Sequence, residues 1–223
     1  WPVVGVIGEN GAFAFWESQG TVKRLYHPEA SEVMAKKLDE VREEILHRVP
    51  ESRVAGDQFA RLFDLAIDFA EEVPRLSLAK AKDIQEIFVE HGAVAKISSI
   101  HVNGWFGSWD KKSMVQTFGL EHLGLDWQTL RACSIYLGDS PNDEPLFASF
   151  DSSIGVANVV EFLPQMESTP SFVTRNEGGL GFAEAIQVNL GEIDIFGRQL
   201  PVIDYLIHSQ LPRSCAIKPS APP

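Results

Sequence analysis

The stretch that decides the fold is Tyr136-Leu137-Gly138-Asp139-Ser140-Pro141-Asn142-Asp143-Glu144. It continues a short apolar run, residues 134–137, which predicts a strand. Gly138 lets the chain turn where that strand ends, so Asp139 is delivered to its carboxyl end. Ligands of open α/β sheets bind at this edge. The stretch is therefore the first candidate for a functional site.

The polar residues of this stretch favour a magnesium site. Asp139, Asn142 and Asp143 bring two carboxylates and an amide within five residues. Mg²⁺ prefers few carboxylates, completed by water and phosphate oxygens. The alternative is an acidic turn that caps the next helix, with Asp143 as the N-cap. Spacing alone leaves both interpretations open.

Outward from this stretch, apolar periodicity predicts strands that alternate with helices. This order indicates an α/β fold with a parallel sheet in the C-terminal half. We predict a hairpin from residues 11–16 and 21–26, and the run 3–7 reads as a buried strand. The other predicted strands are 65–69, 94–102 (one bent strand or two), 134–137, 153–156 and 171–174, and the predicted helices are 29–48, 77–91, 110–122, 144–150, 179–187 and 201–209.

The chain length and the element order suggest a core interrupted by a second lobe. Residues 28–103 contain helices and strands of their own, so they form the predicted inserted α/β domain. Residues 1–27 and 104–211 form the predicted core. Residues 212–223 are rich in Pro and Ser and are expected to be a flexible tail.

Five motifs, in order, resemble one family. Gly138-Asp139-Ser140-Pro141-Asn142-Asp143 resembles the fourth motif of the haloacid dehalogenase (HAD) superfamily, in its Cof-like and sucrose-phosphatase-like branch. Ile7-Gly8-Glu9-Asn10-Gly11-Ala12 is similar to the turn before a hairpin in that branch. Asp110-Lys111 resembles the start of the helix that carries the third-motif lysine. The segments 153–158 and 172–182 resemble the strand after the metal motif and the closing strand and helix.

The resemblance implies a Rossmann-like core with an inserted α/β cap. It also implies Mg²⁺-dependent hydrolysis of a phosphomonoester through an aspartyl-phosphate intermediate. In this scheme Asp139 is a direct metal ligand, and Asp143 ligates the metal or orients it through water. Asn142 bridges the loop and the phosphate. Lys111 neutralises the phosphoryl group, with Lys112 as the alternative if the register differs by one.

The resemblance also points to residues that contact the substrate, a small phosphate ester and by preference a phosphorylated sugar. Asn10 and Gly11 would line the mouth of the site, although Asn-Gly is also a common turn. His101 and Asn103, close to the return from the inserted lobe, would contact the leaving group. His101 has the alternative of simply alternating outward on a strand.

One part of the family pattern is missing. The first motif, Asp-x-Asp-Gly-Thr, supplies the nucleophile, and it occurs nowhere in the sequence. The nearest acidic pair, Glu192-Ile193-Asp194, lacks the Gly-Thr turn, and the second motif has no clear match. We expect the nucleophile to lie upstream of Trp1, so that the parent protein is active and this chain alone is not. The alternatives are a phosphomannomutase-like phosphotransferase and a non-catalytic metal- or sugar-phosphate-binding member or fragment.

Composition excludes several other classes. With 19 basic and 31 acidic side chains, the net charge of −12 argues against a nucleic-acid partner. No apolar run approaches the ~20 residues that span a membrane. Two cysteines are too few for a disulfide framework, so Cys133 is expected to be a buried thiol and the compartment to be the cytoplasm. The sequence does not determine the oligomeric state.

Overall fold

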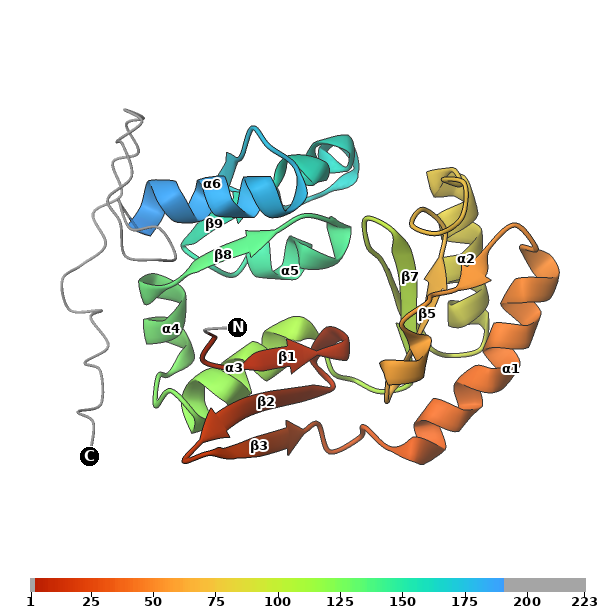
Figure 1. Cartoon of the computed structure of the whole chain (residues 1–223). Helices are drawn as coiled ribbons and strands as arrows, with labels where there is room; N and C mark the ends of the chain where they lie inside the picture. Colours follow the sequence, from red (N-terminus) through yellow and green to blue (C-terminus); the bar gives the residue numbers. More distant parts are fainter. Residues whose placement is uncertain (1–2, 191–223) are drawn as a thin grey trace.

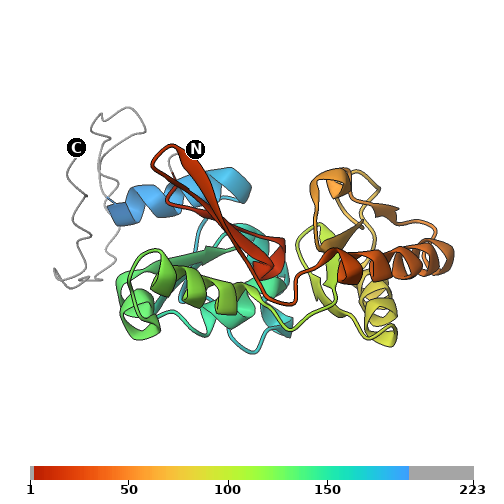
Figure 2. The same cartoon turned by 90° about the horizontal axis from the view of Figure 1, so that it is seen from below.

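The computed structural model describes residues 3–190, which form two lobes of mixed helix and strand (Figure 1). One lobe runs from α1 (Glu32–Arg48) to β7 (His101–Trp105), and the other holds the remaining elements. Figure 2 shows two chain segments passing between the lobes, one before α1 and one after β7. The predicted α/β fold is confirmed.

The lobe between α1 and β7 is an antiparallel sheet with helices on one face. The strands β4 (Arg53–Val54), β5 (Asp64–Asp68), β7 and β6 (Val94–Ile97) lie in that order. Both helices begin at a serine N-cap, Ser31 for α1 and Ser77 for α2 (Leu78–Glu90). Their apolar faces pack on the sheet in one buried cluster, which includes Val41, Ile45, Leu65, Ile67, Ile84, Phe88 and Val102.

The opposite face of this sheet is polar and is turned toward the other lobe. Because side chains alternate along a strand, Leu65 and Ile67 face the helices while Asp64 and Asp68 face away. Strand pairing places residues of neighbouring strands in one row on this second face, among them Ala66, Asn103 and Lys96. A carboxylate, an amide and an ammonium group therefore share the surface from which the inserted lobe meets the core.

The core lobe contains two separate sheets among residues 3–190. The strands β1 (Val6–Gly8), β2 (Phe13–Ser18) and β3 (Thr21–Tyr26) form an antiparallel sheet that packs on α3 (Lys111–Glu121). The strands β10 (Phe172–Val173), β9 (Ser152–Gly155) and β8 (Ile135–Gly138) form the predicted parallel sheet. The helices α4 (Trp127–Cys133), α5 (Glu144–Phe147) and α6 (Gly178–Leu190) complete the lobe.

Several sequence predictions are corrected by the structure. The run 3–7 is not a buried strand: β1 begins at Val6, and Val3, Val4 and Val6 are all more than half exposed. In β1, Ile7 packs against the cluster of Ala14, Met114 and Phe118, whereas Val6 is exposed, so only one face of the strand is covered. For the segment 94–102, expected to be one bent strand or two, the structure confirms two strands, β6 and β7. The helix α4, capped by Asp126, was not predicted.

Other predictions concern Cys133, the C-terminal residues and the domain boundaries. Cys133, expected to be a buried thiol, is only partly buried, and Cys215 lies outside the described residues. Residues 201–209 and 212–223 lie outside the described residues. β7 crosses the predicted domain boundary at residue 103, and the boundaries stay predictions. No helix within residues 3–190 is long and apolar enough to cross a membrane.

The packing of α2 on the sheet can be tested with two substitutions on one helix. Ile84 is fully buried, whereas Val89 is 59% exposed. We expect Ile84→Ala to lower the free energy of unfolding by about 2–5 kcal/mol, because it leaves a cavity among the residues around it. Val89→Ala, the control, should change it by less than about 0.5 kcal/mol. Urea titration of both variants measures the difference, and equal effects would contradict the packing described.

Candidate active site

The loop after β8 is built around the buried carboxylate of Asp143. Gly138 is the last residue of β8. It has no room for a side chain, because a Cβ there would lie 2.7 Å from the Cβ of Asp143. One Asp143 oxygen, Oδ2, accepts hydrogen bonds from the backbone N–H groups of Asp139 (2.9 Å) and Ser140 (3.3 Å). The other, Oδ1, accepts from the Tyr136 hydroxyl (2.7 Å) and the Lys111 ammonium (2.6 Å). Both oxygens of Asp143 are thus used within the protein.

The lysine that reaches this loop is Lys111. It opens α3 directly after the N-cap Asp110, whose carboxylate accepts the backbone N–H of Ser113. The Lys111 ammonium contacts Asp143 and also donates to Asn142 Oδ1 at 3.3 Å. Lys112 instead lies over the ring of Trp127, 5.8 Å from its centroid. Geometry therefore selects Lys111, while its catalytic role stays a prediction.

The pKa values of Asp143 and Tyr136 are shifted in opposite directions. Burial acts to raise the pKa of Asp143, but the Lys111 charge and the hydrogen bonds of Lys111 and Tyr136 outweigh it, so this pKa lies below its ordinary value. Burial, followed by the neighbouring Asp143 charge, raises the pKa of the Tyr136 hydroxyl. Asp143 is therefore ionised and Tyr136 neutral over the whole physiological pH range.

Asp139 differs from Asp143 in that its carboxylate accepts no hydrogen bond from the described residues. Mg²⁺ is commonly held by one or two protein carboxylates, with water and substrate phosphate completing the shell. Asp139 fits such a direct ligand, and Asp143 fits a group that orients the loop. No three His, Cys, Asp or Glu side chains cluster as a metal site within residues 3–190. Asp139 therefore fits a cation such as Mg²⁺ that takes most of its ligands from water and substrate phosphate.

The predicted turn at Glu9, Asn10 and Gly11 joins the two lobes. Glu9 and Asn10 have positive φ angles of 45° and 56°, which are uncommon for residues with side chains. The Glu9 carboxylate accepts three backbone N–H groups from the inserted lobe, those of Leu62 (2.7 Å), Phe63 (2.5 Å) and Asp64 (3.1 Å). Gly11 packs against the linker between β7 and α3, at Asp110.

The reason Gly11 must be a glycine lies in that linker. Its φ is 102°, and a Cβ there would lie 2.2 Å from the carbonyl oxygen of Asp110. Asp110 directly precedes Lys111, so close packing at Gly11 helps to place the start of α3. Gly11 is buried and acts on the site through the backbone, whereas its neighbour Asn10 lines a cavity.

Asp64 is a buried carboxylate on the polar face of the inserted sheet. It pairs with Arg61 (3.0 Å) and accepts the Asn10 amide at 3.3 Å. The ion pair acts to lower its pKa, but burial has the larger effect, and the nearby charges of Glu9 and Asp57 add to it. Together they raise the pKa of Asp64 to about 6.

Two cavities lie where the lobes meet. The smaller, about 60 Å³, is lined by residues of both lobes, including Asn10, Lys96, Trp105, Lys111 and Asn142. The larger, about 250 Å³, is lined by Leu78, Lys82, Gln85, Lys96 and Ile97 of the inserted lobe and by Pro141, Asn142, Glu144, Phe162, Gln165 and Met166 of the core. The structure thus brings the predicted residues Asn10, Lys111 and Asn142 together.

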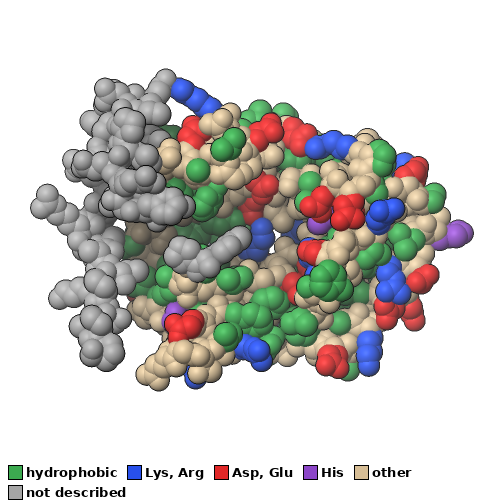
Figure 3. Space-filling view, viewed as in Figure 1, with side chains coloured by type: hydrophobic (Ala, Val, Ile, Leu, Met, Phe, Trp, Pro, Cys, Tyr) green, Lys and Arg blue, Asp and Glu red, His purple; other side chains and the backbone are tan. Residues whose placement is uncertain are grey.

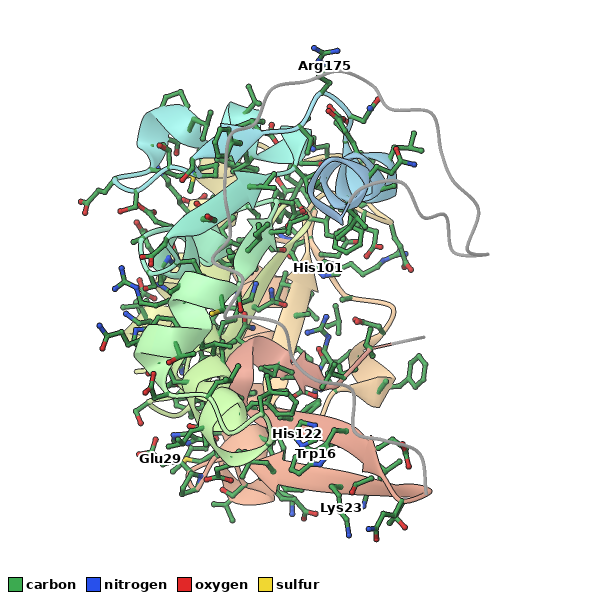
Figure 4. All side chains as sticks on the ribbon, turned by 90° about the vertical axis from the view of Figure 1, so that its left-hand side faces the viewer. Trp16, Lys23, Glu29, His101, His122 and Arg175 are labelled. Carbon is green, nitrogen blue, oxygen red and sulfur yellow. The ribbon has the colours of Figure 1, made fainter. Side chains whose placement is uncertain are left out.

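The other two predicted substrate residues are placed less directly. Asn103 is buried, accepts from Arg61 at 3.4 Å and lies in strand register with Lys96. His101 lines neither cavity, and its Nε2 lies 2.8 Å from the Glu71 carboxylate. It lies on β7, in the sheet of the inserted lobe, and is labelled in Figure 4.

Sequence reasoning missed Lys96, Tyr136 and the Arg61–Asp64 pair. Lys96 alternates with apolar residues, which indicates that it lies on the exposed face of a strand. This pattern does not indicate which part of the protein that face contacts.

No family model matches the sequence, and no curated protein matches it. Solved structures do. SMU.1108c from Streptococcus mutans superposes with a TM-score of 0.57 at 14% identity, over 83% of this chain and 76% of that chain. A HAD subclass IIB sugar phosphatase gives 0.55 at 10% identity (83% and 75%). The sucrose-phosphatase from Synechocystis, in complex with sucrose and phosphate, gives 0.51 at 16% identity (80% and 71%). The chain shares the fold of these three proteins.

The buried Asp64 makes stability depend on pH. Its pKa is about 6 in the folded protein against an ordinary 3.8, so the folded state binds this proton more tightly. The stabilisation is present at about pH 4 and is lost as pH rises through about 6. We expect wild type to lose up to about 3 kcal/mol relative to Asp64→Asn over this range. Urea titrations at several pH values measure it, with Asp83→Asn on exposed α2 surface as control. A pH-independent difference would refute the assignment.

Proposed function

We propose that the protein is a HAD-superfamily phosphatase that acts on a small phosphate ester, a sugar phosphate. The observation that carries the proposal is the Lys111–Asp143 pair at the carboxyl end of β8, beside the uncommitted carboxylate of Asp139. The shared fold of the solved sugar phosphatases supports it.

The residues of the site have distinct roles in this proposal. Lys111 compensates the charge of the phosphoryl group. Asn142 is held through its oxygen, which accepts from Lys111 and from the Ser140 hydroxyl (2.7 Å), so its amide N–H groups can donate to a phosphate oxygen. Asp139 would hold Mg²⁺, which when bound neutralises phosphoryl oxygens. Asp143 fixes Lys111 and the loop.

The proposed reaction also needs a nucleophile. The 223 residues contain no Asp-x-Asp-Gly-Thr, so the proposal takes the attacking carboxylate from a segment outside this sequence. Among the described residues β8 pairs with β9 on one edge only, so its other edge can receive a strand beside Asp139. The full open reading frame tests this requirement directly.

The missing motif favours one second candidate, a member that binds a phosphate ester without hydrolysing it. The two candidates share every residue described above and differ only in the nucleophile. Release of inorganic phosphate by the full-length protein separates them. A cytoplasmic location stays part of the proposal.

The role of Asp139 can be tested by removing its charge. In the full-length protein, Asp139→Asn should lower Mg²⁺-dependent phosphate release from p-nitrophenyl phosphate by about 100-fold or more, since the metal loses its direct carboxylate. Asp151→Asn, which removes a carboxylate that pairs with Arg131 on the surface, is the control. Wild-type turnover in Asp139→Asn would exclude it as a metal ligand.

Two neighbouring lysines test the register of α3. We expect Lys111→Met to reduce kcat by about 100-fold, because the phosphoryl charge then lacks its cation. Lys112 also lines the smaller cavity, but it contacts Trp127 and not Asn142 or Asp143, so Lys112→Met should change kcat less than about threefold. Circular dichroism checks that both variants fold. The reverse order of effects would shift the site lysine by one residue.

A further inference from the structure

The larger cavity between the lobes carries two lysines that the proposed chemistry does not use. Lys82 projects from α2 and Lys96 from β6, and both line this cavity of about 250 Å³ opposite Asn142 and Gln165. Figure 3 shows Lys or Arg side chains at the bottom of the hollow between the lobes. The cavity is at the small end of ligand pockets and fits a group of monosaccharide size.

The charges of these lysines are not compensated. Neither forms an ion pair with a described residue, whereas Arg61 nearby is held by Asp57 and Asp64. The only carboxylate among the lining residues is Glu144. Its Oε1 is turned to the backbone N–H groups of Glu167 (2.6 Å) and Ser168 (2.7 Å). In a protein of net charge −12, two unpaired ammonium groups in one hollow favour an anion.

Lys96 connects this cavity to the site of the phosphoryl group. It lines both cavities, as does Asn142, and the smaller cavity contains Lys111. It lies in register with Asn103 on the polar face of the sheet. An ester whose phosphate lies beside Lys111 and Asn142 therefore has room for its leaving group between Lys96 and Lys82.

We propose that the larger cavity binds a leaving group that is itself anionic, with Lys82 and Lys96 as the residues that select it. The substrate class is a phosphorylated sugar of monosaccharide size that carries a second acidic group, a carboxylate or a second phosphate. The inference rests on the proposed function for the position of the first phosphate. A neutral sugar phosphate would leave both ammonium groups without a partner.

Three esters and four proteins test this by isothermal titration calorimetry in the presence of Mg²⁺. The ligands are glucosyl phosphate, glucuronosyl phosphate, which differs by one carboxylate, and a glucose bisphosphate. The proteins are wild type, Lys82→Gln, Lys96→Gln and the control Lys23→Gln. Lys23 lies on the exposed strand β3, away from both cavities (Figure 4).

We expect wild type and Lys23→Gln to bind at least one acidic ester about fivefold more tightly than the neutral ester, a preference weakened by salt. Lys82→Gln and Lys96→Gln should each reduce it. Which acidic ester is preferred identifies the second group. Equal affinity for all three, no binding of any, or a preference that survives both lysine substitutions would overturn the inference.

Turnover separates this inference from the proposed function. If the full-length protein releases phosphate from p-nitrophenyl phosphate but shows no acidic preference in binding, the function stands and the inference fails. If the acidic preference is found but no ester is hydrolysed, the lysine assignment stands and the phosphatase proposal fails.

Discussion

The ion pair between partly exposed Lys111 and buried Asp143 is the constraint on which the site depends. Asp143 is 3% exposed, and an unpaired charge at such depth would cost several kcal/mol. The lysine from α3 and the tyrosine from β8 meet on its Oδ1, while Oδ2 holds the backbone of the loop. The pair therefore fixes the helix, the strand and the loop relative to one another. The Asp139 carboxylate takes no part in these hydrogen bonds and stays available for the proposed metal ion.

The turn at Glu9 links the inserted lobe to the core lobe that holds the Lys111–Asp143 pair. Two left-handed residues in succession cost about 1–3 kcal/mol each. Three backbone N–H groups donating to one carboxylate offset that cost, because hydrogen bonds to a charged acceptor are the stronger kind. Asn10 lines the cavity that contains Lys111, and Gly11 packs on the residue before it. The position of the inserted lobe and the shape of the site are thus set by the same three residues.

The sequence predicted what depends on local pattern. The helices predicted over 29–48, 77–91 and 110–122 begin within three residues of their predicted starts, and the Gly138-Asp139 step marked the end of a parallel strand. It misjudged the run 3–7, since β-branched residues indicate a strand without saying whether both faces are covered.

Features that depend on pairing between distant segments were not predictable. The row that joins Lys96 to Asn103 needs the register of β6 against β7, and the Arg61–Asp64 pair needs the loop to fold back on β5. Both lie on the face where the lobes meet, which no local pattern describes.

The placement of the acidic side chains explains how a protein of charge −12 can offer a cationic hollow. Three carboxylates near the junction accept backbone N–H groups. Asp68 holds residues 70–72, Glu9 holds residues 62–64, and Glu144 holds residues 167 and 168. These hydrogen bonds stabilise the loops, and the one carboxylate that lines the larger cavity, Glu144, accepts two of them, while Lys82 and Lys96 stay unpaired among described residues. Local geometry, more than net charge, decides which ligand such a surface accepts.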